Sequence, residues 1–242
     1  LANKENYLIN FDKINFNFTK KEKTNEKLLN CSDFFKIDED ILLLKENQVT
    51  IDKNIYIPKD FLVVLKSGQK IILKNDAFIF SNSPWSAIAN ENKISISGDE
   101  DNFGGGILIS SKNKRSFFNN VTFSNLKGPD DDIKKEFLIF GSLNFYETNV
   151  ELRNIEFDNI ISEDAINIFR SNFNIQNAKF NRIISDGIDF DFSKGMANNL
   201  SFENIGDDAL DFSGSEANIN GFYSKFVGDK VLSAGEMSVI EA

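Results

Sequence analysis

One short motif recurs through the second half of the chain, in which two apolar residues flank a single Asn, Asp or Leu. Its copies begin at Leu143, Ile166, Ile188, Leu210 and Val231. The second apolar position of each copy is expected at Phe145, Ile168, Phe190, Phe212 and Ser233, so the steps are 23, 22, 22 and 21 residues. Strands that return at a nearly constant period of this length are typical of a solenoid, in which each coil buries its apolar face against the next.

The spacing within each copy favours strands. Apolar and polar residues alternate with a period of two, whereas a helix needs apolar residues three or four positions apart. A second apolar column is expected at Phe123, Phe157, Phe180, Phe202 and Phe226. We therefore predict an all-β fold, a right-handed parallel β-helix of about 22-residue coils stacked at the spacing of neighbouring strands, about 4.8 Å.

The repeat also predicts the domain organisation. We expect residues 1–242 to form a single β-helix domain, with a cap region over residues 1–40 in which Phe18 to Phe35 has helical character. The step of 34 residues between Phe123 and Phe157 predicts an inserted loop at residues 126–141. The chain starts without Met and stops in the middle of a repeat, so we interpret it as a piece of a longer protein.

Charge and composition exclude several classes of function. The net charge of −10 argues against nucleic acid as a partner, because phosphates are met by clustered Lys and Arg. No apolar run reaches the ~18 residues needed for membrane insertion. The chain has one cysteine and no histidine, which removes disulfide frameworks, His-based metal sites and Ser-His-Asp triads.

Stacked coils would bring carboxyl groups together in two columns. The first column is expected at one corner of four successive coils and consists of Asp164, Asp186, Asp208 and Asp229. The second is expected on the outward face of the adjoining strand and consists of Asn144, Asn167, Asp189 and Asp211. Like charges one strand spacing apart repel each other, so cations, a metal ion, raised pKa values or hydrogen bonds from turn amides must offset the repulsion.

Three interpretations of these columns stay open. The carboxyls could be an acid–base site, in which Arg170, Lys194 and Lys230 hold an acidic glycan, Asp229 also contacts the substrate, and Trp85 or Tyr146 stacks on a sugar ring. They could be structural, since Asp and Asn at corners commonly accept hydrogen bonds from turn N–H groups. Asp189 and Asp211 could instead hold Ca²⁺, which prefers oxygen ligands, although no cofactor is required by the other two interpretations.

Several short sequence motifs resemble those of known β-helix proteins. From about residue 55 onward, Gly104-Gly-Gly-Ile-Leu-Ile109, Ser162-Glu-Asp-Ala-Ile-Asn-Ile168 and Gly206-Asp-Asp-Ala-Leu-Asp-Phe212 are similar to bacterial right-handed parallel β-helix repeat proteins of the pectin-lyase-like superfamily. That resemblance implies the fold, and an extracellular or cell-surface location.

A narrower resemblance concerns chemistry. Ser185-Asp-Gly-Ile-Asp189 and Gly206-Asp-Asp208 resemble the first two motifs of polygalacturonase-type glycoside hydrolases. The resemblance implies that Asp186, Asp207 and Asp208 occupy the acid and water-activating positions. The third motif departs from the family, because Asp229 stands where the family has histidine before Lys230, and no Arg-Ile-Lys follows. We expect a polysaccharide-directed protein that cleaves glycosides; the alternative is a non-catalytic scaffold segment of a larger surface protein.

Overall fold

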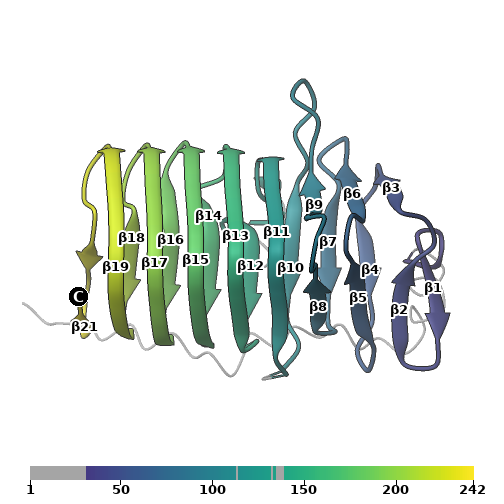
Figure 1. The fold of residues 1–242 in the computed structure, drawn as a ribbon, viewed down its shortest axis with the longest axis horizontal. Helices are drawn as coiled ribbons and strands as arrows, with labels where there is room; N and C mark the ends of the chain where they lie inside the picture. Colours follow the sequence, from purple (N-terminus) through teal and green to yellow (C-terminus); the bar gives the residue numbers. More distant parts are fainter. Residues whose placement is uncertain (1–30, 113, 132, 135–138) are drawn as a thin grey trace, which may run out of the picture.

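The chain folds into a parallel β-solenoid of about eight turns of about 23 residues, which confirms the predicted fold class (Figure 1). This computed structural model describes residues 31–112, 114–131, 133–134 and 139–242. The helix expected between Phe18 and Phe35 lies almost entirely outside the described residues. Within them, no helix is long and apolar enough to cross a membrane.

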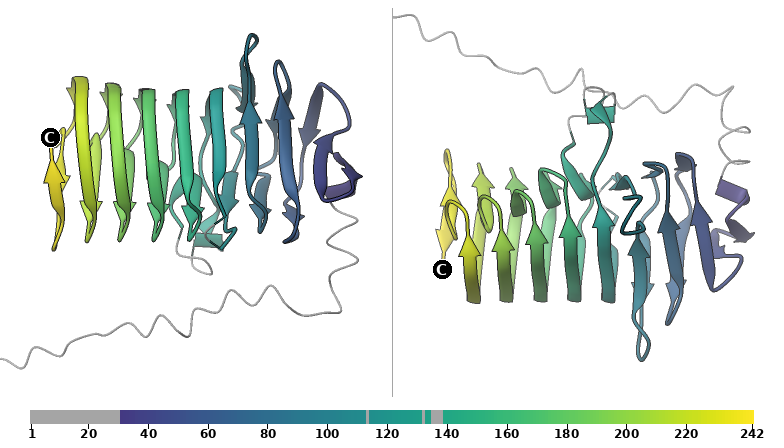
Figure 2. Two further views of the ribbon diagram at one scale, coloured as in Figure 1. Left: turned by 60° about the horizontal axis from the view of Figure 1, so that its bottom comes forward. Right: turned by 90° about the horizontal axis from the view of Figure 1, so that it is seen from above.

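Two sheets run the length of the solenoid (Figures 1 and 2). Along its main path the first sheet, sheet A, consists of β1 (Phe35–Asp38), β2 (Ile41–Leu44), β5 (Leu62–Lys66), β8 (Trp85–Ile88), β11 (Ser116–Leu126), β13 (Val150–Ile160), β15 (Asn172–Ile183), β17 (Lys194–Ile205), β19 (Glu216–Val227) and β21 (Val239–Glu241). The shorter β3 (Gln48–Ile51), β6 (Lys70–Leu73) and β9 (Ile94–Ser97) join it through β11. All pairings in sheet A are parallel except β1 with β2.

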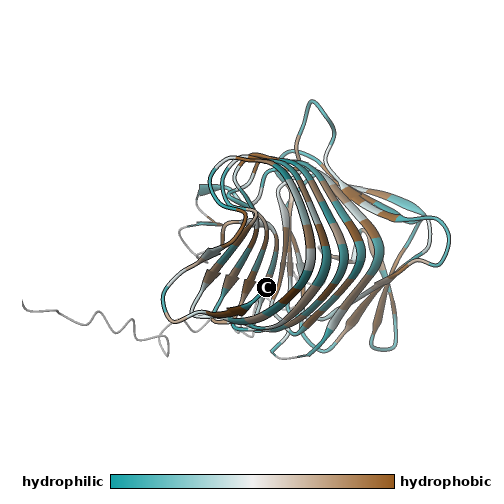
Figure 3. Cartoon of the chain, turned by 60° about the vertical axis from the view of Figure 1, so that its left-hand side comes forward, coloured by the Kyte–Doolittle hydropathy of each residue, from teal (hydrophilic) through white to brown (hydrophobic). Residues whose placement is uncertain are grey.

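Sheet B faces sheet A across the core and is parallel throughout. In spatial order it contains β4 (Ile55–Ile57), β7 (Phe78–Ser81), β10 (Gly106–Ile109), β12 (Gly141–Tyr146), β14 (Asp164–Phe169), β16 (Asp186–Asp191), β18 (Leu210–Ser213) and β20 (Ser233–Ala234). Apolar side chains of both sheets form one continuous core cluster, and Figure 3 shows hydrophobic bands that recur at the same place in successive coils.

Phenylalanine rings stack from coil to coil inside this core. The rings of Phe123, Phe157, Phe180 and Phe202 lie parallel, with centroids 4.6, 5.3 and 4.9 Å apart. Strand pairing aligns these residues directly, as the 34-residue step with its insertion predicted. Each ring buries a large apolar area without a polar atom to satisfy, and offset stacking adds to that gain.

The long strands of sheet A bend at an asparagine in the left-handed region. Asn154, Asn177 and Asn199 have φ values of 50°, 57° and 55°, and Gly221 takes the same place in β19 with φ 68°. Asparagine tolerates this conformation better than other residues with a side chain. The side chains also bond one another along the stack, since Asn177 Nδ2 donates to Asn154 Oδ1 at 3.0 Å and Asn199 Nδ2 donates to Asn177 Oδ1 at 3.1 Å.

A buried column of hydroxyl groups closes the turn from sheet B into sheet A. Each hydroxyl oxygen accepts a hydrogen bond from the backbone N–H at the equivalent corner position one coil earlier, at 2.7–3.2 Å, along Thr148, Ser171, Ser193, Ser215 and Ser238. A buried N–H without a partner is costly, so this column satisfies the corner where strand pairing stops. Sequence reasoning did not identify it.

Two predicted registers near the C-terminal end are wrong. Phe202 pairs with Ser224, and Phe226 lies two residues further on, 68% exposed, at φ 57°. Phe212 pairs with Ala234, so Ser233 pairs with Asp211. Phe226 occupies the left-handed corner that Asn204 occupies one coil earlier, and apolar character alone misplaced it by two positions.

The segment between β11 and β12 stands out from the coils (Figure 2). Its Ile133 and Ile139 pack with Phe78, Phe80 and Leu108 on the outward face of sheet B, in a second apolar cluster. The inserted segment therefore covers the N-terminal part of that face and leaves the later coils uncovered by this cluster.

We predict that Phe180→Ala lowers the free energy of unfolding by roughly 3–5 kcal/mol, because it removes a fully buried ring stacked on both sides. Equilibrium urea unfolding followed by far-UV circular dichroism measures the change. Phe226→Ala is the matched control and should change stability by less than about 0.5 kcal/mol. Equal losses in the two variants would contradict the observed register.

Candidate functional site

The outward face of sheet B changes from apolar to acidic along the solenoid. In the paired register, Leu108 is followed by Asn144, Asn167, Asp189 and Asp211. Five carboxyls gather over β14, β16 and β18, and we call them the acidic face: Asp164, Asp186, Asp189, Asp191 and Asp211. The predicted second column is therefore present, and its asparagine members are buried.

Asn144 belongs to the fold. Its Nδ2 donates to the carbonyl oxygens of Ile107 and Gly141 at 3.1 and 2.7 Å, and its Oδ1 accepts the Gly141 N–H at 2.9 Å. The side chain is 1% exposed. This amide is fully used within the protein.

Asn167 holds two aspartates in place one coil further on. Its Nδ2 donates to Asp189 Oδ2 at 2.9 Å and to Asp191 Oδ2 at 3.3 Å. Burial and the charges of Asp164, Asp191 and Asp211 raise the pKa of Asp189 well above its usual range. Burial also raises the pKa of Asp191, although hydrogen bonds from Asn167 and Asp189 oppose the shift. Burial and the crowding of carboxyls therefore favour the protonated form of Asp189, next to Asp191.

Asp164 is the most deeply placed carboxyl of the acidic face. It is 3% exposed, and its Oδ2 has no hydrogen-bond partner. Burial raises its pKa well above the usual range, and the charges of Asp186, Glu163, Asp191 and Asp211 act in the same direction. An unpaired buried acceptor is uncommon in proteins and marks a place where a donor would be favourable.

Asp186, Asp207 and Asp208 meet at one corner of two successive coils. Asp186 Oδ1 accepts the Asp208 N–H at 2.9 Å, while the N–H of Asp207 donates to the carbonyl oxygen of Ser185 at 3.1 Å. Burial raises the pKa of Asp186 to about 6, with the nearby charges of Asp207 and Asp208 adding to the shift against the hydrogen bond from the Asp208 amide. Asp207 is exposed and Asp208 is buried.

The first predicted column, at the corner of the coils, is aligned as expected at Asp164 and Asp186 but not at Asp229. Asp164 and Asp186 pair directly, but Asp208 Oδ1 accepts the N–H of Lys230 at 2.8 Å, and Asp229 stacks on Asp207. The side chains of Asp207, Asp208 and Asp229 still bring one oxygen each to within 4.8 Å of one another. Lys230 Nζ contacts the carboxyl of Asp229 and lies 3.6 Å from Asp208 Oδ1, so an ammonium group already balances this trio.

The other predicted cations also face carboxylates outside the acidic face. Arg170 Nη1 lies 3.7 Å from Glu147 Oε1, an ion pair one coil apart as expected. Lys194 pairs with Glu216 on sheet A. These contacts leave the acidic face with an excess of carboxyl groups.

Aromatic side chains border the acidic face. Tyr146 stacks on Phe169 with centroids 5.0 Å apart, and Phe192, half exposed, meets Phe169 edge to face at 5.9 Å. Phe169 pairs directly with Asp191 in the sheet. Trp85 is fully buried and cannot stack on a sugar ring, unlike the expectation from sequence.

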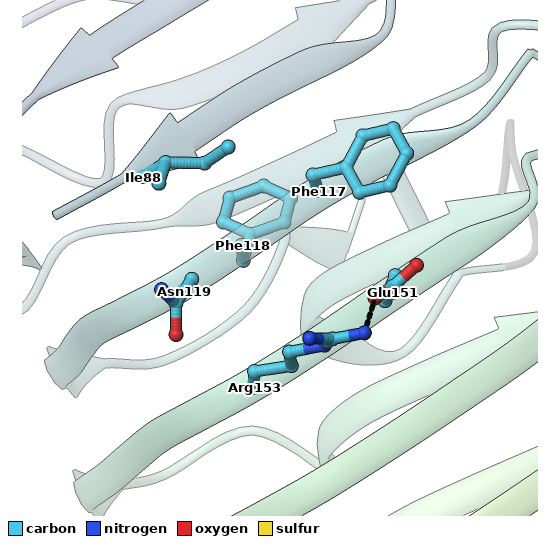
Figure 4. Close-up of a pocket in the computed structure, with 6 residues that line it drawn as sticks. All are labelled: Ile88, Phe117, Phe118, Asn119, Glu151 and Arg153. Atoms are coloured by element: carbon cyan, nitrogen blue, oxygen red, sulfur yellow. Dashed lines mark ion pairs between the residues drawn. The ribbon is translucent and has the colours of Figure 1, made fainter. Parts of the chain in front are cut away.

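A shallow pocket on the outer surface of sheet A offers a weaker candidate (Figure 4). Phe117 and Ile88 are partly exposed there, and an ion pair between Arg153 and Glu151 crosses it. Its two charged groups neutralise each other, so it offers no group with unusual proton affinity.

Comparison with protein-family models, with curated proteins and with solved structures finds no match. The class of protein is therefore defined by the fold alone, as a parallel β-solenoid. The sequence reasoning missed Asp191 and the role of Asn167. A period-two count would have found Asp191, because Asp189 and Asp191 lie on the same face of a strand.

We predict that raising the pH from about 4 to about 6 destabilises wild type relative to Asp186→Asn. The folded protein holds the Asp186 proton more tightly than the unfolded chain does, since the pKa is about 6 against an ordinary 3.8. Stability from this group is complete below the unfolded pKa and falls as the pH rises through the folded pKa. Asparagine cannot ionise, yet it keeps the oxygen that accepts the Asp208 amide.

Urea unfolding midpoints measured at each pH test this difference. Glu203→Gln, on sheet A, serves as the control and should run parallel to wild type. A constant gap between Asp186→Asn and wild type across the range would show that Asp186 titrates normally.

Proposed function

We propose that the protein binds a polysaccharide along the acidic face and hydrolyses glycosidic bonds by acid–base chemistry at Asp186, Asp207 and Asp208. The observation that carries the proposal is Asp186, a half-buried carboxyl whose pKa of about 6 lets it hold a proton in mildly acidic solution. A general acid works best when its pKa lies near the working pH. The likeness of Ser185–Asp189 and Gly206–Asp208 to polygalacturonase-type motifs supports the same three residues.

Each carboxyl has a role that follows from its surroundings. Asp186 donates its proton to the glycosidic oxygen, so that the sugar leaves as an alcohol. Exposed Asp207 accepts a proton from a water molecule whose oxygen bonds to the anomeric carbon. Buried Asp208 holds Lys230 beside the site through its Oδ1 and thereby positions the corner. The proton lost by water replaces the one that Asp186 gave up.

Asp189 and Asp191 do not suit this reaction as a pair. Their carboxyls hydrogen-bond to each other, whereas the two carboxyls of a glycosidase lie about 5 Å or more apart to admit the sugar or water. They serve substrate binding in this proposal. Ca²⁺ at Asp189 and Asp211 is a further way to offset their charge, since both supply oxygen ligands.

A non-catalytic scaffold is the second candidate. It is favoured by the hydrogen bonds that Asp186 and Asp208 accept from backbone amides one coil away, because such bonds stabilise the corner without any substrate. In that case the solenoid would be a spacer or interaction segment of a larger surface protein. Both candidates fit the extracellular or cell-surface location that the resemblance implies.

We predict that the protein releases new reducing ends from a glycan panel of neutral, acidic and amino polymers, assayed with Ca²⁺ and with EDTA. Asp186→Asn should lower the rate by about 10²–10⁴-fold, the usual contribution of a general acid. Asp158→Asn, on sheet A, is the control and should leave the rate unchanged. Binding without cleavage would favour the scaffold, and absence of both would remove the carbohydrate proposal.

A further inference from the structure

We propose that the acidic face recognises a glycan carrying free amino groups, and that its carboxyls pair with the ammonium groups of the polymer. This inference rests on the proposed binding of a polysaccharide and names the class of that polysaccharide. It differs from the acidic glycan expected from sequence.

Charge balance is the first support. Asp186, Asp189, Asp191 and Asp211 are half-buried and reach solvent on adjoining coils. The cations expected to hold an acidic sugar contact other carboxylates: Arg170 with Glu147, Lys194 with Glu216, and Lys230 with Asp229 and Asp208. A polyuronide on this surface would bring like charges together, whereas a cationic chain would relieve the crowding already present.

Asp164 is a second and independent support. Its Oδ2 lacks a hydrogen-bond partner although the residue is 3% exposed. The carboxyls that act on it most strongly are Asp186, Glu163, Asp191 and Asp211, so this unpaired acceptor belongs to the acidic face. A donor brought to this face would satisfy that oxygen, and an ammonium group supplies N–H donors together with a positive charge that favours the ionised form of the carboxyl.

The neighbouring amide and aromatic groups suit a sugar amine better than a bare metal ion. The amide nitrogen of Asn167 points at Asp189 and Asp191 and fixes their oxygens, leaving the remaining acceptor sites for an incoming donor. Phe192, half exposed and next to Asp191 in the chain, offers a ring surface, whereas Phe169 is already covered by the ring of Tyr146 and by the guanidinium of Arg170, 5.3 Å from its centroid. Aromatic rings attract ammonium groups and pack against the apolar faces of sugar rings.

The test is isothermal titration calorimetry with three hexamers, of β-1,4-linked glucosamine, N-acetylglucosamine and galacturonic acid. Each is titrated at pH 6 in low and moderate salt, and Ca²⁺ alone is titrated as a fourth ligand. We expect the glucosamine hexamer to bind at least about tenfold more tightly than the acetylated one, the scale of one charge-assisted contact. Added salt should weaken that binding.

Variants separate a specific site from the general attraction of a chain with net charge −10 for any polycation. Asp189→Asn/Asp191→Asn should weaken binding of the glucosamine hexamer about tenfold. The single variant Asp211→Asn serves if the double variant fails to fold. Glu203→Gln replaces one carboxyl, as Asp211→Asn does, but on sheet A, and should leave the affinity unchanged.

Each remaining outcome overturns the inference. Equal binding of the acetylated hexamer, tighter binding of the galacturonic acid hexamer, or equal losses in Glu203→Gln and the double variant would refute amine recognition while leaving polysaccharide binding intact. Ca²⁺ binding that disappears in the double variant would assign the acidic face to a metal ion. Failure of all three hexamers to bind would refute polysaccharide binding as well.

Discussion

Parallel pairing between residues one coil apart is the constraint on which the whole structure depends. It places each residue on the equivalent residue of the next coil, so any side chain that recurs in sequence becomes a stack in space. Phenylalanine, asparagine and hydroxyl groups gain from this arrangement through ring stacking or hydrogen bonds. Carboxyl groups lose from it, because the same geometry brings Asp164 onto Asp186 and Asp189 onto Asp211.

The acidic face thus combines repelling carboxyl groups with a fold in which the residues within the other stacked columns attract one another. Two features offset this repulsion. At the corner, backbone amides and Lys230 stabilise Asp186 and Asp208, whereas on the strand face the amide of Asn167 donates to both Asp189 and Asp191 and the pKa of Asp189 is raised. Departures from local consistency tend to mark functional positions, and here the departure spans only three coils.

Most of the architecture could be predicted, because the period of 22–23 residues and the alternation of apolar and polar residues within strands are both evident in the amino-acid sequence. The column through Asn167 was correct, as was the column through Phe157 from Phe123 to Phe202. The errors arose where residues of the same type were aligned even though the spacing between them did not match the repeat. Asp229 was aligned with Asp208, although a strict step of 22 residues leads to Lys230, and Phe226 was taken for a core residue although it occupies a left-handed corner. The burial of Asn144 and the raised pKa of Asp189 depend on packing across coils, which no single-strand pattern displays.

The segment between β11 and β12 illustrates how such an architecture tolerates change. β11 ends at Leu126 and β12 begins at Gly141, yet Leu126 pairs with Ile160 and Gly141 with Asp164, as if the coil were of ordinary length. The chain can therefore leave the stack at this corner and return without changing the strand register on either side. Foreign peptides grafted there would be displayed on the outside of a rigid rod, whereas one added residue inside a strand would turn every later side chain of that strand to the opposite face.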